Sequence, residues 1–159
     1  MKYRWFVVVL ALVAASAFAL SVQAGQWWSI GEVKIGPFGS RSPFGGQSDL
    51  AWAGGTVRWA RFGMATWAAG LIAMFVLVIV GGGAAARRVP RLAAKTSLVA
   101  IATASLAAIG FIAGRPENGM PFSPDRGMVL FGVAVIAGLV AAVRVLRSPP
   151  AAPGPAAQS

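Results

Sequence analysis

Four carboxylates are the groups with which this 159-residue chain would have to do general acid–base chemistry, and they fall into two pairs. Glu32 and Asp49 lie in one polar stretch, and Glu117 and Asp125 lie in another. Two carboxylates that a fold brings together can act as a general acid and a general base. Each pair also has Arg or Lys close by in sequence, so ordinary surface ion pairs account for these groups. We therefore predict no catalytic residue and keep an enzyme that uses Glu117 and Asp125 as an alternative.

Other reactive side chains are missing or lack the context that they need. The chain has no Cys and no His, which excludes disulfides, thiolate nucleophiles, imidazole bases and the usual zinc and iron–sulfur ligand sets. Its glycine-rich pieces, 54–55 and 81–83, lack the Lys and Ser/Thr context of a phosphate-binding loop. We therefore predict no cofactor and no metal site.

The elements that carry these residues are dominated by four long apolar blocks. Only 11% of the residues are charged, against roughly 25% in soluble domains. The blocks cover residues 5–24, 65–86, 96–114 and 128–146, and a helix needs about 20 residues to cross a bilayer. We predict an all-α integral membrane protein, with one four-helix domain over 1–147 and a small extended or β-like outer loop. The Pro/Ala-rich segment 148–159 is predicted to be a disordered tail.

Basic residues predict how the blocks are oriented. Eight cations and no acid flank the starts of the first and third blocks and the ends of the second and fourth. They are Lys2, Arg4, Arg87, Arg88, Arg91, Lys95, Arg144 and Arg147. The positive-inside rule then places both termini in the cytoplasm and loops 25–64 and 115–127 outside, most simply in a bacterial inner membrane. Because lipid headgroups account for the net charge of +10, no nucleic-acid partner is predicted.

The first block also fits a signal peptide. Lys2 and Arg4 precede an apolar run, and Val22 and Ala24 occupy small-residue positions before a cleavage site. The run is long for a signal peptide, so we favour a retained first helix and leave cleavage open.

Small residues recur every four positions in the other three blocks. They are Ala65, Ala69 and Ala73, then Ala100, Ala104 and Ala108, and finally Ala134, Gly138 and Ala142. Such stripes let helices approach closely in lipid, and we expect them to pack within the bundle. The triplet 81–83 is expected to end the second helix.

The loop 25–64 holds most of the remaining information. It begins with Trp27 and Trp28, continues as a strand-like segment whose phase shifts near Gly31, as a bulge would allow, and then repeats a Pro-Phe unit at 37–38 and 43–44. A third Pro-Phe unit lies at 121–122. These units predict turns that present aromatic rings, either as a small lid over the bundle or as a surface for another molecule.

Trp, Phe and Arg side chains near the outer boundary give two sets of candidate binding residues. Trp at this depth forms an aromatic belt in many membrane proteins, but Trp and Arg are also enriched at protein interfaces. The candidate partner-docking residues are Trp27, Trp28, Phe38, Phe44, Trp52, Trp59 and Phe122. The candidate lipid-headgroup contacts are Arg58, Arg61, Arg87, Arg88, Arg91 and Lys95.

The layout resembles that of the claudin-like four-helix membrane proteins. The likeness consists of a long first outer loop that starts with Trp27-Trp28, Arg58 and Arg61 before the second helix, a short basic inner connection and a shorter second outer loop. The Gly-Leu-Trp motif and the paired cysteines of that group are absent here. The resemblance implies an adhesion, barrier or accessory role without enzymatic activity.

Three functional hypotheses follow. The first is a non-enzymatic membrane scaffold or accessory subunit whose outer loops dock another membrane protein or a second copy. The alternative is an oligomeric channel or transporter component, although the apolar blocks hold no ionisable group except Arg144 near an end. The third is the membrane enzyme named above.

Overall fold

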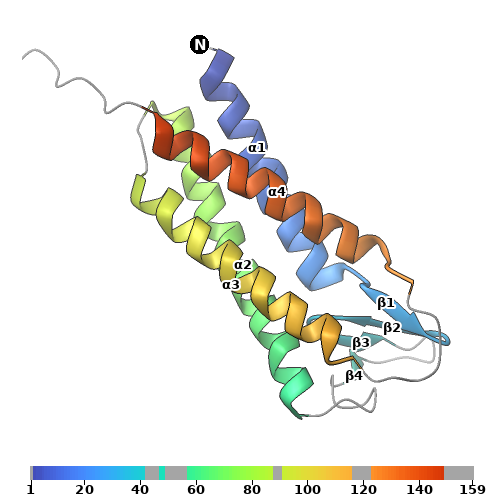
Figure 1. The fold of residues 1–159 in the computed structure, drawn as a ribbon. Coiled ribbons are helices and arrows are strands. Elements are labelled where there is room, and N and C mark those ends of the chain that lie inside the picture. The colour runs from blue at the N-terminus through green and yellow to red at the C-terminus, as the bar shows by residue number, and fades with distance from the viewer. Residues whose placement is uncertain (1, 42–46, 49–56, 88–90, 116–122, 149–159) are drawn as a thin grey trace, which may run out of the picture.

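A computed structural model describes residues 2–41, 47–48, 57–87, 91–115 and 123–148. Four long helices form an up-and-down bundle: α1 (Lys2–Ala19), α2 (Val57–Ala85), α3 (Arg91–Ala113) and α4 (Arg126–Arg147). Helix α1 packs against α2 and α4, and α3 packs against the same two helices. A small sheet lies at one end of the bundle (Figure 1). We call this the sheet end, and the opposite end, where α1 begins and α4 stops, the termini end.

Each helix is long and apolar enough to cross a membrane. Large apolar side chains cover the outside of the bundle, among them Phe75, Leu106 and Ile136. Such a surface is stable in hydrocarbon but not in water. The prediction of an all-α, four-helix integral membrane protein is therefore confirmed.

Helix α2 is longer than predicted at its start. It begins at Val57, eight residues before the expected position 65, so residues 57–64 are helical and do not belong to a loop. Trp59 and Gly63 in this extension, and Thr66 just after it, are buried. Spacings of four and three residues place them on one face of the helix. Tertiary packing thus extends the helix beyond its most apolar part.

The expectation that the glycine triplet ends α2 is wrong, because the helix continues to Ala85. Gly81 instead lies against α1, where a Cβ atom at its position would be 3.4 Å from the Cβ of Ala11. Glycine therefore serves close helix packing here. The connection beyond Arg87, including Pro90, lies outside the described residues.

The small-residue stripes pack inside the bundle, as predicted, with one exception. Eight of the nine residues are buried, whereas Ala65 is exposed. In the same interior, Thr66 and Ser97 donate hydrogen bonds to the carbonyls of Phe62 and Ala94 in their own helices. Their hydroxyls are thereby satisfied without forming a polar path.

Helix α1 is an integral part of this bundle. Ala14 and Phe18 belong to the larger buried cluster and Val7 and Ala11 to the smaller one. Removal of residues 1–24 by signal cleavage would take these side chains out of both. The packing supports the retained helix, whose presence an intact mass of the purified chain will decide.

The sheet follows a π-helical turn, Leu20–Ala24, that ends the first helix. Its strands β1 (Trp28–Ile30), β2 (Val33–Gly36), β3 (Gly39–Arg41) and β4 (Gln47–Ser48) form an antiparallel meander in chain order. Gly31, with φ of +58°, lies in the two-residue turn between β1 and β2. The phase shift expected as a bulge is therefore a tight hairpin turn, in which glycine favours the positive φ.

Candidate functional site at the sheet end

Six aromatic side chains, which we call the aromatic cluster, join the sheet to the helices. They are Phe18, Trp27, Trp28, Trp59, Phe111 and Phe131. The Trp59 ring stacks on Phe111 at 5.0 Å with an interplanar angle of 10°. Ring centroids are also 5.0 Å apart between Trp28 and Phe111 and between Trp27 and Phe131. Each such pair contributes about 0.5–1.5 kcal/mol beyond the burial of its area.

Hydrogen bonds fix the two most deeply buried indoles. Trp59 Nε1 donates to the Phe111 carbonyl at 2.7 Å, which lies in the last turn of α3, where carbonyls lack the usual helical partners. Trp27 Nε1 donates to the carbonyl and hydroxyl oxygens of Ser21, both at 3.2 Å. Ser21 Oγ in turn donates to the Gly127 carbonyl at 2.7 Å. The indole groups are thus satisfied in the interior. The bond of Trp59 joins α2 to α3, and those of Trp27 and Ser21 join the π-helical turn to α4.

Backbone contacts add a second attachment between the sheet and α4. Asp125 N donates to the Trp27 carbonyl and Gly127 N donates to the Gln26 carbonyl, both at 2.9 Å. Gly25 and Gly127 meet so closely that a Cβ atom on Gly25 would lie 2.8 Å from the Gly127 Cα. The sheet is therefore held on the bundle by rings on one side and by main chain on the other.

The prediction that Trp27, Trp28 and Trp59 dock a partner is wrong for this arrangement, because all three side chains are buried. Trp28 lies on the inward face of β1, and Trp59 lies on the inward face of the α2 extension. Their rings fill the space between sheet and helices and are not displayed at the surface. The other candidates Phe44, Trp52 and Phe122 lie outside the described residues.

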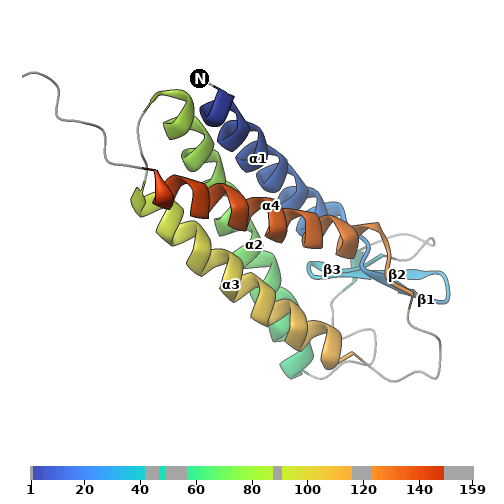
Figure 2. The ribbon, with the colours of Figure 1, turned by 45° about the horizontal axis from the view of Figure 1, so that its top comes forward.

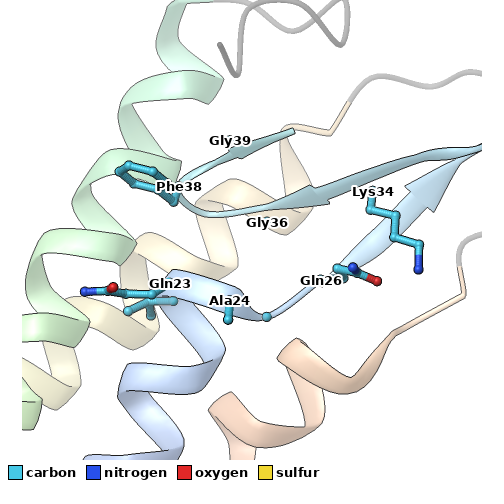
Figure 3. A pocket seen from close by; sticks show the side chains of 9 residues that line it. Gln23, Ala24, Gln26, Lys34, Gly36, Phe38 and Gly39 are labelled. Carbon is cyan, nitrogen blue, oxygen red and sulfur yellow. The ribbon is translucent and has the colours of Figure 1, made fainter. Parts of the chain in front are cut away.

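Phe38 is the predicted docking residue that the structure does place at the surface. It lies in the Pro37–Phe38 turn between β2 and β3, as the Pro-Phe unit predicted, and its side chain is 42% exposed. Figure 3 shows the ring at this turn beside α2, where its centroid is 5.3 Å from that of Trp67. The contact supports one side of the ring and leaves the rest accessible.

Basic residues also lie on the sheet and on the first turns of α2. Lys34 is exposed, whereas its neighbour Ile35 is buried, so Lys34 lies on the face of β2 turned away from the bundle. The register places Lys34 opposite Arg41 of β3. Arg58 and Arg61, predicted as headgroup contacts in a loop, are exposed on the first turns of α2.

The cavity behind Phe38 is too small for a ligand. It lies between the π-helical turn and the β2–β3 hairpin, with Gln23, Gln26 and Lys34 among its lining residues (Figure 3). Its volume of about 20 Å³ is enough for about one water molecule. Among the described residues, no group of three His, Cys, Asp or Glu side chains could hold a metal ion.

The termini end carries the remaining predicted headgroup contacts. Arg87, Arg91 and Lys95 are exposed there, and Arg88 lies outside the described residues. Two further arginines lie over rings of α1: the Arg4 guanidinium is 5.1 Å from the Trp5 ring, and that of Arg144 is 5.9 Å from the Phe6 ring. Arg–aromatic pairs of this kind are suited to the membrane boundary, where rings lie in the headgroup zone.

No family model matches the sequence, and no curated protein matches it significantly.

Proposed function

We propose that the chain is a non-enzymatic membrane scaffold or accessory subunit that docks another membrane protein, or a second copy of itself, through the sheet end. The observation that carries this proposal is the contrast among the aromatic residues. The cluster rings are buried and hydrogen-bonded, whereas Phe38 is exposed at a turn of the sheet that they hold in place. An exposed aromatic ring supported on a rigid base is suited to be an anchor residue of a protein interface.

The docking proposal predicts that Phe38→Ala removes the partner and leaves the fold intact. Loss of a hot-spot ring costs about 2 kcal/mol or more of binding energy, which lowers occupancy at least tenfold near the dissociation constant. The test is purification of the full chain with a C-terminal tag in mild detergent. Intact mass and stoichiometry of everything that copurifies are then measured.

Phe75→Ala is the matched control, because Phe75 is 63% exposed in the middle of α2 and far from the sheet. It should retain the copurifying protein or dimer. Equal retention by Phe38→Ala and Phe75→Ala would contradict docking through the hairpin.

We further propose that the membrane is a bacterial inner membrane, with the termini end in the cytoplasm and the sheet outside. Described cations at the termini end include Arg4, Arg87, Arg91, Lys95, Arg144 and Arg147, which the positive-inside rule assigns to the cytoplasm. The order of one helix, a four-stranded meander and three further helices supports the resemblance to the claudin-like proteins.

Single-cysteine labelling tests this orientation, since the native chain has no Cys. Ser29 is exposed on β1 and Ala86 is exposed after α2, at opposite ends of the bundle. We expect a membrane-impermeant maleimide to label Ser29→Cys in intact spheroplasts and to label Ala86→Cys only after permeabilisation. The reverse pattern would contradict the proposed orientation.

A further inference from the structure

A second, larger cavity lies where α1 and α4 meet at the sheet end. It is formed by the π-helical turn, the segment that leads into β1 and the first residues of α4; the turned view of Figure 2 shows the same end of α4 beside the segment that enters β1. The lining residues are Leu20, Ala24, Gly25, Gln26, Asp125, Arg126, Gly127 and Leu130. Its volume is about 280 Å³, close to the lower end of the roughly 300–1,000 Å³ of small-ligand sites. We call it the α1–α4 groove.

The groove is apolar toward the membrane and polar toward water. Leu20 and Leu130 belong to the membrane-spanning parts of α1 and α4, and Leu20 is 54% exposed. Gln26 and Asp125 line the opposite part, beyond the ends of the spans, and Arg126 is the first residue of the α4 span. A phospholipid has the same arrangement, with its acyl chains in the hydrocarbon and its headgroup at the water boundary. The apolar and polar parts of the groove therefore lie at the depths of an acyl chain and a headgroup.

The polar part carries one charge of each sign on adjacent residues. Asp125 Oδ1 accepts a hydrogen bond from Arg126 N at 2.6 Å and thereby caps α4. Gly127 N is already bonded to the Gln26 carbonyl, so the start of α4 offers no free nest of amides for an anion. Recognition must therefore come from the side chains of Arg126, Asp125 and Gln26, which all line the groove.

Two glycines allow close main-chain contact at the floor of the groove. A Cβ atom on Gly127 would lie 2.7 Å from the Gln26 carbonyl oxygen, and one on Gly25 would lie 2.3 Å from the Ser21 carbonyl oxygen. The floor therefore consists of main chain in close contact, joined by hydrogen bonds between α4 and the segment before β1.

We propose that the α1–α4 groove binds a zwitterionic phospholipid with a primary ammonium group, of the phosphatidylethanolamine type. The Arg126 guanidinium pairs with the phosphate, as arginine does in charge-assisted contacts. The Asp125 carboxylate, with the Gln26 side chain, accepts hydrogen bonds from the ammonium group, and the upper acyl chain lies along Leu20 and Leu130. A quaternary ammonium has no proton to donate, so phosphatidylcholine lacks the second contact. An anionic headgroup meets the Asp125 charge and is disfavoured.

The test uses the full chain in nanodiscs of mixed phosphatidylethanolamine, phosphatidylcholine and phosphatidylglycerol, released for native mass spectrometry of retained lipids. We expect one phosphatidylethanolamine to be retained preferentially. Arg126→Gln should lower its retention about tenfold, since a hydrogen bond between charged groups contributes about 1.5–3 kcal/mol. Asp125→Asn keeps a good helix cap but removes the negative charge that faces the ammonium group, so it should reduce the preference for ethanolamine over choline lipids.

Arg115→Gln serves as the control, because Arg115 is an exposed arginine at the same end of the bundle but is not in the groove lining. It should leave retention unchanged. Preferential retention of phosphatidylglycerol, equal retention of all three lipids, or an equal effect of Arg115→Gln and Arg126→Gln would overturn the proposal. Leu130→Trp provides a second variant, which fills the apolar part without changing charge and should also reduce retention.

Discussion

Replacing Trp59 with alanine is expected to lower the free energy of unfolding by about 3–5 kcal/mol, the usual cost of removing a buried large aromatic side chain. The ring is 1% exposed and stacks on Phe111. Its Nε1 donates to the Phe111 carbonyl at 2.7 Å. The substitution therefore leaves a cavity between α2, α3 and the sheet together with a carbonyl that has lost this donor.

Unfolding of the detergent-solubilised chain by a denaturing detergent, followed by circular dichroism, measures this loss. Trp5→Ala is the matched control, because the Trp5 side chain is 54% exposed at the other end of the bundle and should change stability by less than about 1 kcal/mol. Trp59→Phe retains much of the ring but lacks the donor, so it should fall between the two. Equal stability of Trp59→Ala and Trp5→Ala would mean that the aromatic cluster does not hold the sheet.

Gly127→Ala is expected to destabilise the protein by about 1–3 kcal/mol, although alanine is otherwise the better helix former. The added Cβ atom would lie 2.7 Å from the Gln26 carbonyl oxygen and from the Gly25 carbonyl carbon. Both are main-chain atoms, which cannot turn aside as a flexible side chain would. Helix α4 and the segment before β1 must therefore separate, and the bond from Gly127 N to the Gln26 carbonyl weakens.

Gly132→Ala provides the comparison within the same helix, since a Cβ atom there meets nothing within 4 Å. It should leave stability unchanged or raise it slightly through helix propensity. The same unfolding assay reads both variants. Opposite signs for the two are expected, and a loss at Gly132 equal to that at Gly127 would contradict the close contact.

The four spans could be predicted from sequence because hydrophobic length is a local property. The start of α2 could not be predicted, because Arg58 and Arg61 make this segment look like a polar loop. Both are exposed on the helix, whereas Trp59 between them is buried. The interval from Trp59 through Gly63 to Thr66 was the available signal. This spacing indicates a buried helix face only once the stacking of Trp59 on Phe111 of α3 is known.

The roles of the tryptophans depend on partners that are distant in the chain. An indole near the ends of apolar helices fits a lipid boundary, an interface or a core equally well, because each accommodates an apolar ring with one donor. Trp27 lies in the core, where the Phe131 ring is 5.0 Å away and Ser21 accepts a hydrogen bond from the indole Nε1. Gly25 and Gly127 are in contact although they are about one hundred positions apart in the chain, and no local sequence pattern predicts that contact.

The charge pattern, by contrast, was informative about position but not about structural role. Asp125 is one of the two carboxylates of the acid–base alternative, and in the structure it caps α4 by accepting a hydrogen bond from Arg126 N. Its proposed partner Glu117 lies outside the described residues. A carboxylate directly before a helix is a common N-cap. Because α4 begins at Arg126, Asp125 occupies that position.

Site-specific photo-crosslinking in cells tests docking through the sheet end most directly. A photoreactive amino acid at position 38 should give one crosslinked product of defined mass, either a dimer or a complex with one membrane protein. The same amino acid at position 75, which is exposed on the membrane-spanning part of α2, should give none. No product at position 38, or the same product at both positions, would contradict the account.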